Sequence, residues 1–132
     1  MAYALIDGHC DTISRFMEVG GNLYSNDGQV DLKRLKGYES PCQVFALWLD
    51  EKYYSAALRQ TLKMIDFFQE QMKICEKWIR PVYTYADYEK NRREKKMSAL
   101  LSVEGGEALE GEISSLHILH QLGVRMMTLT WN

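Results

Sequence analysis

Near the start of the chain, a histidine and an aspartate follow an apolar run at a spacing that suits metal binding. The run Tyr3–Ile6 is followed by His9 and Asp11, two residues apart. Side chains on an extended strand alternate between its two faces, so His9 and Asp11 point to the same side. Imidazole nitrogen and carboxylate oxygen are both zinc ligands. Because H-x-D arises often by chance, a metal site here needs further ligands from elsewhere in the chain.

A third ligand of this kind follows a later apolar run. Glu104 comes directly after Met97–Val103 and is followed by two glycines, which let the backbone approach a neighbour closely. Three protein ligands leave zinc one position for water, which loses a proton near neutral pH and attacks an amide carbonyl. His9, Asp11 and Glu104 therefore predict a hydrolytic metal site. A hydrogen-bonded polar cluster that closes one end of a sheet is the alternative for the same residues.

These residues need a scaffold that brings them to one rim. Four near-continuous apolar runs are typical of parallel strands that are buried on both faces. They are Tyr3–Ile6, Gln43–Leu49, Met97–Val103 and Arg125–Thr130. The spacing of apolar residues between the runs predicts helices over Tyr53–Ile79, Thr84–Lys96 and Glu112–Leu122. The long connection over residues 20–41 is expected to tuck Leu32 and Leu35 against the outside of the sheet.

Alternating strands and helices predict the α/β class, with a parallel sheet and right-handed crossovers. In such sheets the chemistry lies at the carboxyl ends of the strands. His9 and Asp11 follow the first predicted strand, and Glu104 follows the third. We therefore expect these three side chains together at one rim of the sheet.

Composition indicates an ordinary globular chain. The 132 residues are 46% hydrophobic and carry a formal net charge of −2, which argues against a nucleic-acid partner. No apolar run has the length of a membrane span, and no signal peptide precedes the first strand, so we expect no membrane partner. The odd number of cysteines, Cys10, Cys42 and Cys75, favours reduced thiols in a cytoplasmic protein.

Longer stretches resemble the renal (membrane) dipeptidase family of zinc metallopeptidases, which are amidohydrolase-like (β/α)8 barrels. The stretches are IDGHCDT, QVDLKRLK followed by QVFALWLD, and SVEGGEALEG with LHQLGVRMMTLTWN. The resemblance implies that His9 and Asp11 bind the first of two zinc ions. It implies that Glu104 is a catalytic residue whose carboxylate bridges both ions. A hydroxide held between them would attack the peptide bond of a dipeptide substrate.

The resemblance covers the amino-terminal half of such a barrel. A complete TIM barrel needs about 250 residues, whereas this chain supplies about four βα units in one domain, residues 1–132. The family's two further metal-binding histidines, its substrate-contacting histidine and a late aspartate lie beyond the fourth strand. We therefore expect at most one zinc ion here. Either the chain is a truncated piece of a longer protein, or its gene encodes a lone half.

Other polar residues have plainer explanations. His117 and His120 lie three apart on the last predicted helix, where a solvated face is favoured over a metal pair. Cys10 lies between the two ligands, and the pleat turns it to the opposite side for packing. Charges near a helix start account for Glu107 and Glu110. Trp131 and Asn132 end the last strand and approach the substrate side in a full barrel.

Two functions from different classes follow. The first is zinc-dependent hydrolysis of dipeptides, incomplete in this chain alone. The second is a catalytically dead half-barrel that associates with itself. An open half-barrel exposes strand edges and an apolar face, to which Leu5, Phe45, Leu101 and Met127 are assigned. We therefore expect a homo-oligomer or a missing carboxy-terminal half. A nucleotide-binding module is disfavoured because no Gly-rich phosphate loop follows a strand.

Overall fold

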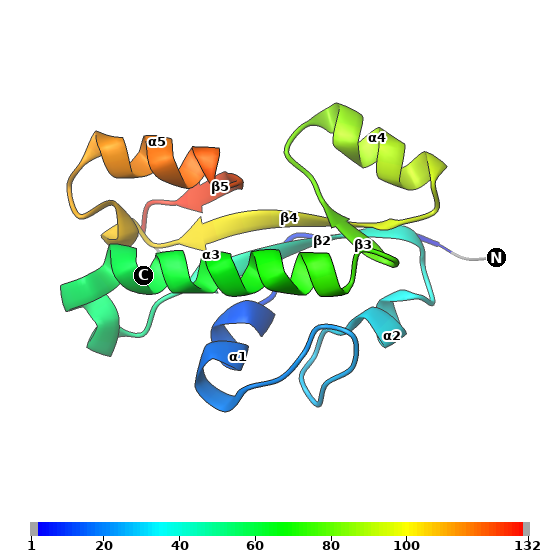
Figure 1. Ribbon diagram of the computed structural model, residues 1–132, viewed down its shortest axis with the longest axis horizontal. Helices are drawn as coiled ribbons and strands as arrows, with labels where there is room; N and C mark the ends of the chain where they lie inside the picture. Colours follow the sequence, from blue (N-terminus) through cyan, green and yellow to red (C-terminus); the bar gives the residue numbers. More distant parts are fainter. Residues whose placement is uncertain (1–2, 131–132) are drawn as a thin grey trace.

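The computed structural model describes residues 3–130 and contains one five-stranded sheet (Figure 1). Its strands are β1 (Ala4–Asp7), β2 (Glu39–Trp48), β3 (Ile79–Pro81), β4 (Met97–Glu104) and β5 (Val124–Thr128). Every neighbouring pair runs parallel, in the order β1-β2-β4, and β3 and β5 both pair with β4. The predicted α/β class with a parallel sheet is therefore confirmed.

Helices connect the strands on both sides of the sheet. They are α1 (Thr12–Val19), α2 (Leu32–Leu35), α3 (Ala57–Ile74), α4 (Tyr85–Arg93) and α5 (Ile113–Gln121), with short 3-10 turns η1 (Glu51–Ala56) and η2 (Glu107–Leu109). In Figure 1, α1, α2 and α3 lie below the sheet as drawn, and α4 and α5 lie above it. The predicted helices from Thr84 and Glu112 are confirmed, because these residues occupy the N-cap positions of α4 and α5.

The predicted helix over Tyr53–Ile79 is wrong at both ends. Its first residues form η1, and α3 ends at Ile74. The chain then turns, and Ile79 begins the short strand β3, which pairs with the first residues of β4 at Met97. Ile79 is fully buried and continues the apolar spacing of α3. Because a buried strand residue and a buried helix residue satisfy the same pattern there, the spacing alone does not mark the helix end.

The first helix, α1, is absent from the sequence-based assignment. It is short, and its buried residues include Ile13 and Phe16, which pack below the sheet. The predicted packing of Leu32 and Leu35 is confirmed, since both are buried and belong to α2. Helix α1 matters for the site because it begins directly after Asp11.

The face assigned to Leu5, Phe45, Leu101 and Met127 is wrong. Phe45 and Leu101 are buried, and Leu5 and Met127 pack against the same core. Phe45 meets Phe68 of α3 with ring centroids 5.8 Å apart, so this set faces the helices. In a strand, shifting by one residue moves a side chain to the opposite face. The other face of the sheet, which no helix covers fully (the open face), therefore carries the residues that alternate with these four along the strands.

The open face is an apolar surface that α4 covers in part. Ile6, Cys42 and Leu100 line a cleft of about 430 Å³ together with Tyr85 and Tyr88 of α4. The side chain of Ile6 remains 69% exposed there. The expectation of an exposed apolar face is thus met by a different set of residues. Within residues 3–130, no helix combines the length and the apolar character that crossing a membrane requires.

Candidate metal centre

His9 reaches the rim through a bulge at the end of β1. Strand β1 ends at Asp7, yet Cys10 returns to the ladder: its N–H donates to the Val44 carbonyl (3.1 Å) and its carbonyl accepts from the Ala46 N–H (2.9 Å). His9 therefore lies outside the ladder, and its N–H donates to the Asp7 carboxylate at 3.1 Å. The prediction that a regular pleat aligns His9 with the aspartate after it is wrong, because the chain is not a continuous strand here.

Asp11 lies at the N-cap of α1, but its carboxylate makes no capping hydrogen bond. An aspartate at this position usually accepts from a backbone N–H of the first turn. Here its Oδ1 instead lies 3.3 Å from Nε2 of His9. The start of α1 therefore turns the carboxylate away from its own helix and toward the histidine.

Glu104 is held at the rim by the end of β4 and the glycines after it. The Gly105 N–H donates to the Thr128 carbonyl and the Gly106 N–H donates to the Leu129 carbonyl, both at 2.9 Å. Gly105 has φ +96°, which favours glycine. A Cβ on Gly106 would lie 2.9 Å from the Leu129 carbonyl oxygen. The two glycines therefore allow β5 to fix the turn that follows Glu104.

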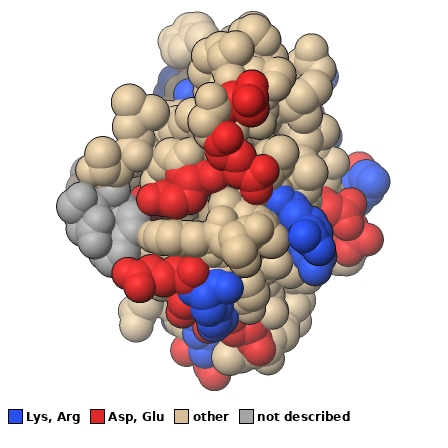
Figure 2. Space-filling model, turned by 90° about the vertical axis from the view of Figure 1, so that its left-hand side faces the viewer, with Lys and Arg blue, Asp and Glu red and all other residues tan. Residues whose placement is uncertain are grey.

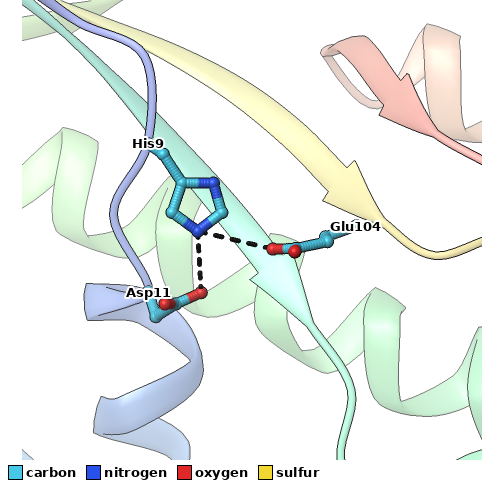
Figure 3. Close-up of side chains that lie close together, drawn as sticks. All are labelled: His9, Asp11 and Glu104. Atoms are coloured by element: carbon cyan, nitrogen blue, oxygen red, sulfur yellow. Dashed lines mark hydrogen bonds and ion pairs between the residues drawn. The ribbon is translucent and has the colours of Figure 1, made fainter. Parts of the chain in front are cut away.

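The three side chains converge on one point at the rim (Figure 3). Nε2 of His9 lies 3.3 Å from Oδ1 of Asp11 and 3.4 Å from Oε2 of Glu104. One ligand atom from each residue lies within 4.8 Å of the others. Ligands bound to tetrahedral zinc at about 2.0–2.2 Å are roughly 3.3–3.6 Å apart. The two distances from the imidazole nitrogen therefore match those around a single zinc ion.

The donor set also suits a divalent cation in charge and exposure. Two carboxylates and a neutral imidazole carry two negative charges, which one Zn²⁺ balances. His9 and Asp11 are about half exposed and Glu104 is 24% exposed, so solvent reaches the group. Among residues 3–130 this is the one group of three or more ligating side chains close enough to share an ion. Without an ion, the same residues form a polar cluster in which His9 hydrogen-bonds to Asp11.

Acidic side chains gather on this end of the molecule. Figure 2 views the carboxyl ends of the strands and shows several Asp and Glu side chains across that surface. Glu104 and Glu107 belong to this end, since η2 follows β4 directly. Glu110 has a structural partner: its carboxylate accepts the Leu58 N–H of α3 at 3.1 Å. Glu110 therefore bonds the start of α3 and not the start of the helix after Glu112, where the sequence placed its role.

Cys10 does not belong to the ligand group. Its side chain is buried in the core, as predicted. Burial raises the pKa of the Cys10 thiol to about 11, so the thiol stays protonated at neutral pH and is a poor ligand. His117 and His120 are exposed on α5 and lie outside the ligand group, as a solvated helix face predicts. Trp131 and Asn132 lie outside the described residues.

Sequence reasoning missed Ser14, which lies one helical turn after Asp11. Its hydroxyl accepts the backbone N–H of Trp48, the last residue of β2, at 2.9 Å. Trp48 in turn lies in register with Glu104 of β4. A serine in a helix turn carries no sequence signal for such a bond, because its partner strand is distant in the chain.

Comparison with known proteins gives a consistent family. All of residues 1–132 match the membrane dipeptidase family, peptidase family M19. The chain is 28% identical to dipeptidase ataJ of Aspergillus terreus over 95% of its own length and 34% of that protein. It is 28% identical to dipeptidase 3 of Mus musculus over 98% of its length and 27% of that protein.

Solved structures give the same fold. Dipeptidase AC, a metallopeptidase of family M19, superposes with a TM-score of 0.86 at 21% identity, over 99% of this chain and 44% of that one. A metallopeptidase from Rhodobacter sphaeroides, solved with a phosphinate mimic of the dipeptide L-Ala-D-Ala, superposes with a TM-score of 0.80 at 18% identity, over 99% and 46%. The parallel sheet is thus a partial barrel, and the chain spans about a quarter to a half of the relatives that it matches.

Proposed function

This chain belongs to the membrane dipeptidase family, peptidase family M19, and from that premise we propose that it supplies the His-Asp-Glu part of a zinc-dependent dipeptidase. The observation that carries the proposal is the convergence of His9, Asp11 and Glu104 within 4.8 Å at the carboxyl ends of β1 and β4. In parallel barrels, this end of the strands is where catalytic residues lie.

In this proposal, His9, Asp11 and Glu104 hold the metal. When bound, zinc polarises the substrate carbonyl and activates water for attack. By its resemblance to the family, Glu104 is the catalytic residue, and one of its two carboxylate oxygens, Oε2, lies 3.4 Å from Nε2 of His9. The second oxygen is then available to a second ion or to a proton on the attacking water. The Gly105 bond to β5 keeps this carboxylate at the rim.

The chain alone holds one ion in this proposal. Its three ligands satisfy one zinc together with water, whereas two ions would share too few donors. Because the chain spans less than half of the relatives that it matches, dipeptide hydrolysis is proposed for the completed site. The remaining ligands would come from the rest of such a protein or from another chain.

Hydrolysis of a dipeptide by the purified chain tests this proposal. We expect little or no turnover by the chain alone, and zinc-dependent turnover when the missing half is supplied on a second polypeptide. Turnover should stop with a chelator and return with zinc. Turnover that persists in the chelator, or an assembled site that remains inactive with zinc bound, would contradict the proposal.

We also propose that the open face drives self-association. The exposed part of that face includes Ile6, and β1 and β5 are edge strands of the sheet. Covering such a surface is favourable by roughly 1.5–3 kcal/mol for each large apolar side chain. A dead self-associating module remains the second candidate function. It accounts for the open face but gives no reason for the three converging ligands.

The three cysteines support a reducing compartment. Cys10, Cys42 and Cys75 are all buried and unpaired. Exported domains usually oxidise their cysteines into disulfides. We therefore propose a cytoplasmic location, which cell fractionation would check; recovery in the extracellular or membrane fraction would contradict it.

A further inference from the structure

We infer that Ser14 positions Asp11 for metal binding by extending the ladder between β1 and β2 with its side chain. This inference rests on the proposed metal site. Ser14 belongs to the first turn of α1 and is not one of the three ligating side chains. Its role is therefore that of a positioning residue and not of a ligand.

The hydrogen bonds along one edge of β2 carry the inference. Cys10 is the last residue after β1 whose backbone pairs with this edge of β2, and its carbonyl accepts from the Ala46 N–H. The next N–H on that edge, from Trp48, donates to the Ser14 hydroxyl at 2.9 Å. The same hydroxyl lies 3.5 Å from the Ala46 carbonyl, within reach as a donor. Ser14 thus bonds two successive ladder groups of β2.

A residue in a parallel strand makes the same two hydrogen bonds to its neighbouring strand with its backbone. It donates to one residue of its neighbour and accepts from the residue two further along. A serine hydroxyl has one donor and two acceptor sites, so it can fill both roles. The backbone itself cannot do so here, because the chain turns into α1 at Asp11. The Ser14 hydroxyl therefore makes the hydrogen bonds to β2 that the backbone after β1 would make if it continued as a strand.

The helix start is used in an unusual way. Asp11 is the N-cap of α1, and Ser14 lies at the third position of the helix. These are the two positions whose side chains often bond each other's backbone in a capping box. In this helix the Asp11 carboxylate faces His9 and the Ser14 hydroxyl faces β2. Because the bond from Ser14 to β2 holds the first turn of α1 in place, the Asp11 carboxylate is not needed as a helix cap and is available to a metal.

The anchor also connects the two halves of the ligand group. Trp48 pairs in register with Glu104 on the other edge of β2. Ser14 therefore fixes the first turn of α1 to the strand residue beside Glu104. This bond therefore sets the distance between the Asp11 and Glu104 carboxylates. That distance must be short if both carboxylates are to bind the same metal ion. Groups that hydrogen-bond directly to a metal ligand typically change metal affinity by about 10–100-fold when removed, and because Ser14 acts one residue further out, we expect the lower end of that range.

Simple packing is the competing explanation. The Ser14 hydroxyl also lies 3.6 Å from the sulfur of Met64 in α3, so it could serve only to join two helices. That role predicts a loss of stability without a specific loss of metal affinity. The positioning role predicts that removing the hydroxyl changes both the exchange rate of the Trp48 amide and the affinity of the site for zinc.

The test compares Ser14→Ala with Thr61→Val in zinc titrations and in amide exchange measured by NMR. Thr61 is buried in α3 and its hydroxyl donates to Ala57 within that helix at 2.9 Å, so Thr61→Val removes a buried hydroxyl that bonds only within its own helix. We expect Ser14→Ala to bind Zn²⁺ about tenfold more weakly, and to exchange the Trp48 amide faster. Thr61→Val should retain both properties, and Ser14→Thr, which keeps the hydroxyl, should restore affinity.

Several outcomes would overturn the inference. They are unchanged zinc affinity in folded Ser14→Ala, equal losses in Ser14→Ala and Thr61→Val, or a Trp48 amide that is already unprotected in the wild-type protein. The last of these needs no variant to fold. If the wild-type chain takes up no Zn²⁺, the proposed metal site fails by itself. The exchange of the Trp48 amide in Ser14→Ala then decides whether Ser14 continues the ladder.

Discussion

The imidazole of His9 lies 3.4 Å from the carboxylate of Glu104, although the two residues follow the first strand and end the fourth. Two parallel pairings produce this contact, because β2 lies between β1 and β4 and joins both. A bulge then carries His9 out of the ladder toward Glu104. The ligand group is therefore a product of sheet order together with one local irregularity.

Replacing Gly106 by alanine should destabilise the protein. The new Cβ would lie 2.9 Å from the carbonyl oxygen of Leu129, a backbone atom that cannot move freely. We expect a loss of about 1–3 kcal/mol in the free energy of unfolding, measured by chemical denaturation. Gly8→Ala is the matched control, because its Cβ would meet no atom within 4 Å. Equal stability of the two variants would contradict the close approach.

Replacing Asp31 by asparagine should remove an acid-sensitive contribution to stability. Burial disfavours the charged form of Asp31, but hydrogen bonds from the backbone and side chain of Arg34 outweigh it and hold its pKa below the ordinary 3.8. A carboxyl with a lowered pKa in the folded state stabilises the fold above its unfolded pKa. That stability is lost as the pH falls through the folded pKa, below about 4.

The variant should therefore lose roughly 1–3 kcal/mol at pH 7 and show a flatter decline of stability with acid below pH 4. Asp27→Asn in the same loop is the control: a hydrogen bond from Arg15 also lowers the pKa of Asp27, but this carboxylate is exposed, so its loss should change stability little. Denaturation at several pH values gives both quantities. Parallel pH profiles for the wild type and Asp31→Asn would contradict this prediction.

Introducing a charge on the open face should reduce self-association. Ile6 and Ile74 are each 69% exposed, but Ile6 lies on the open face and Ile74 ends α3. We expect Ile6→Glu to shift the protein toward a monomer and Ile74→Glu to leave its mass unchanged. Light scattering over a range of dilutions measures both. A wild-type protein that is a well-folded monomer would rule out self-association through this face.

Sequence patterns predicted the elements whose local and tertiary signals agree. The apolar runs at β2 and β4 were identifiable because these parallel strands are buried on both faces. The runs at β1 and β5 were identifiable from their apolar residues alone, since each of these strands leaves residues exposed. The start of α4 was identifiable from Thr84, which forms a capping box with Asp87. The end of α3 before Ile79 was not identifiable, because an apolar residue at position 79 fits both the helical spacing of α3 and a buried position in β3.

The geometry at the rim depended on contacts that the sequence does not reveal. The chain between Asp7 and Cys10 looks like a continuing strand, and its bulge follows from the bonds of Cys10 to β2. The choice of face failed for Phe45 because a continuous apolar run has no alternation to mark the helical side. The bond of Ser14 to Trp48 depends on the position of β2 after folding.

The central claim is that His9, Asp11 and Glu104 bind one zinc ion, and calorimetric titration of the metal-free chain with Zn²⁺ tests it most directly. We expect one ion per chain, with affinity reduced about 100-fold or more in Glu104→Gln, because the variant loses a charged ligand. His117→Ala, which removes an exposed histidine on α5, should bind like the wild type. Two tightly bound ions per monomer, or Glu104→Gln binding zinc as well as the wild type does, would contradict the claim.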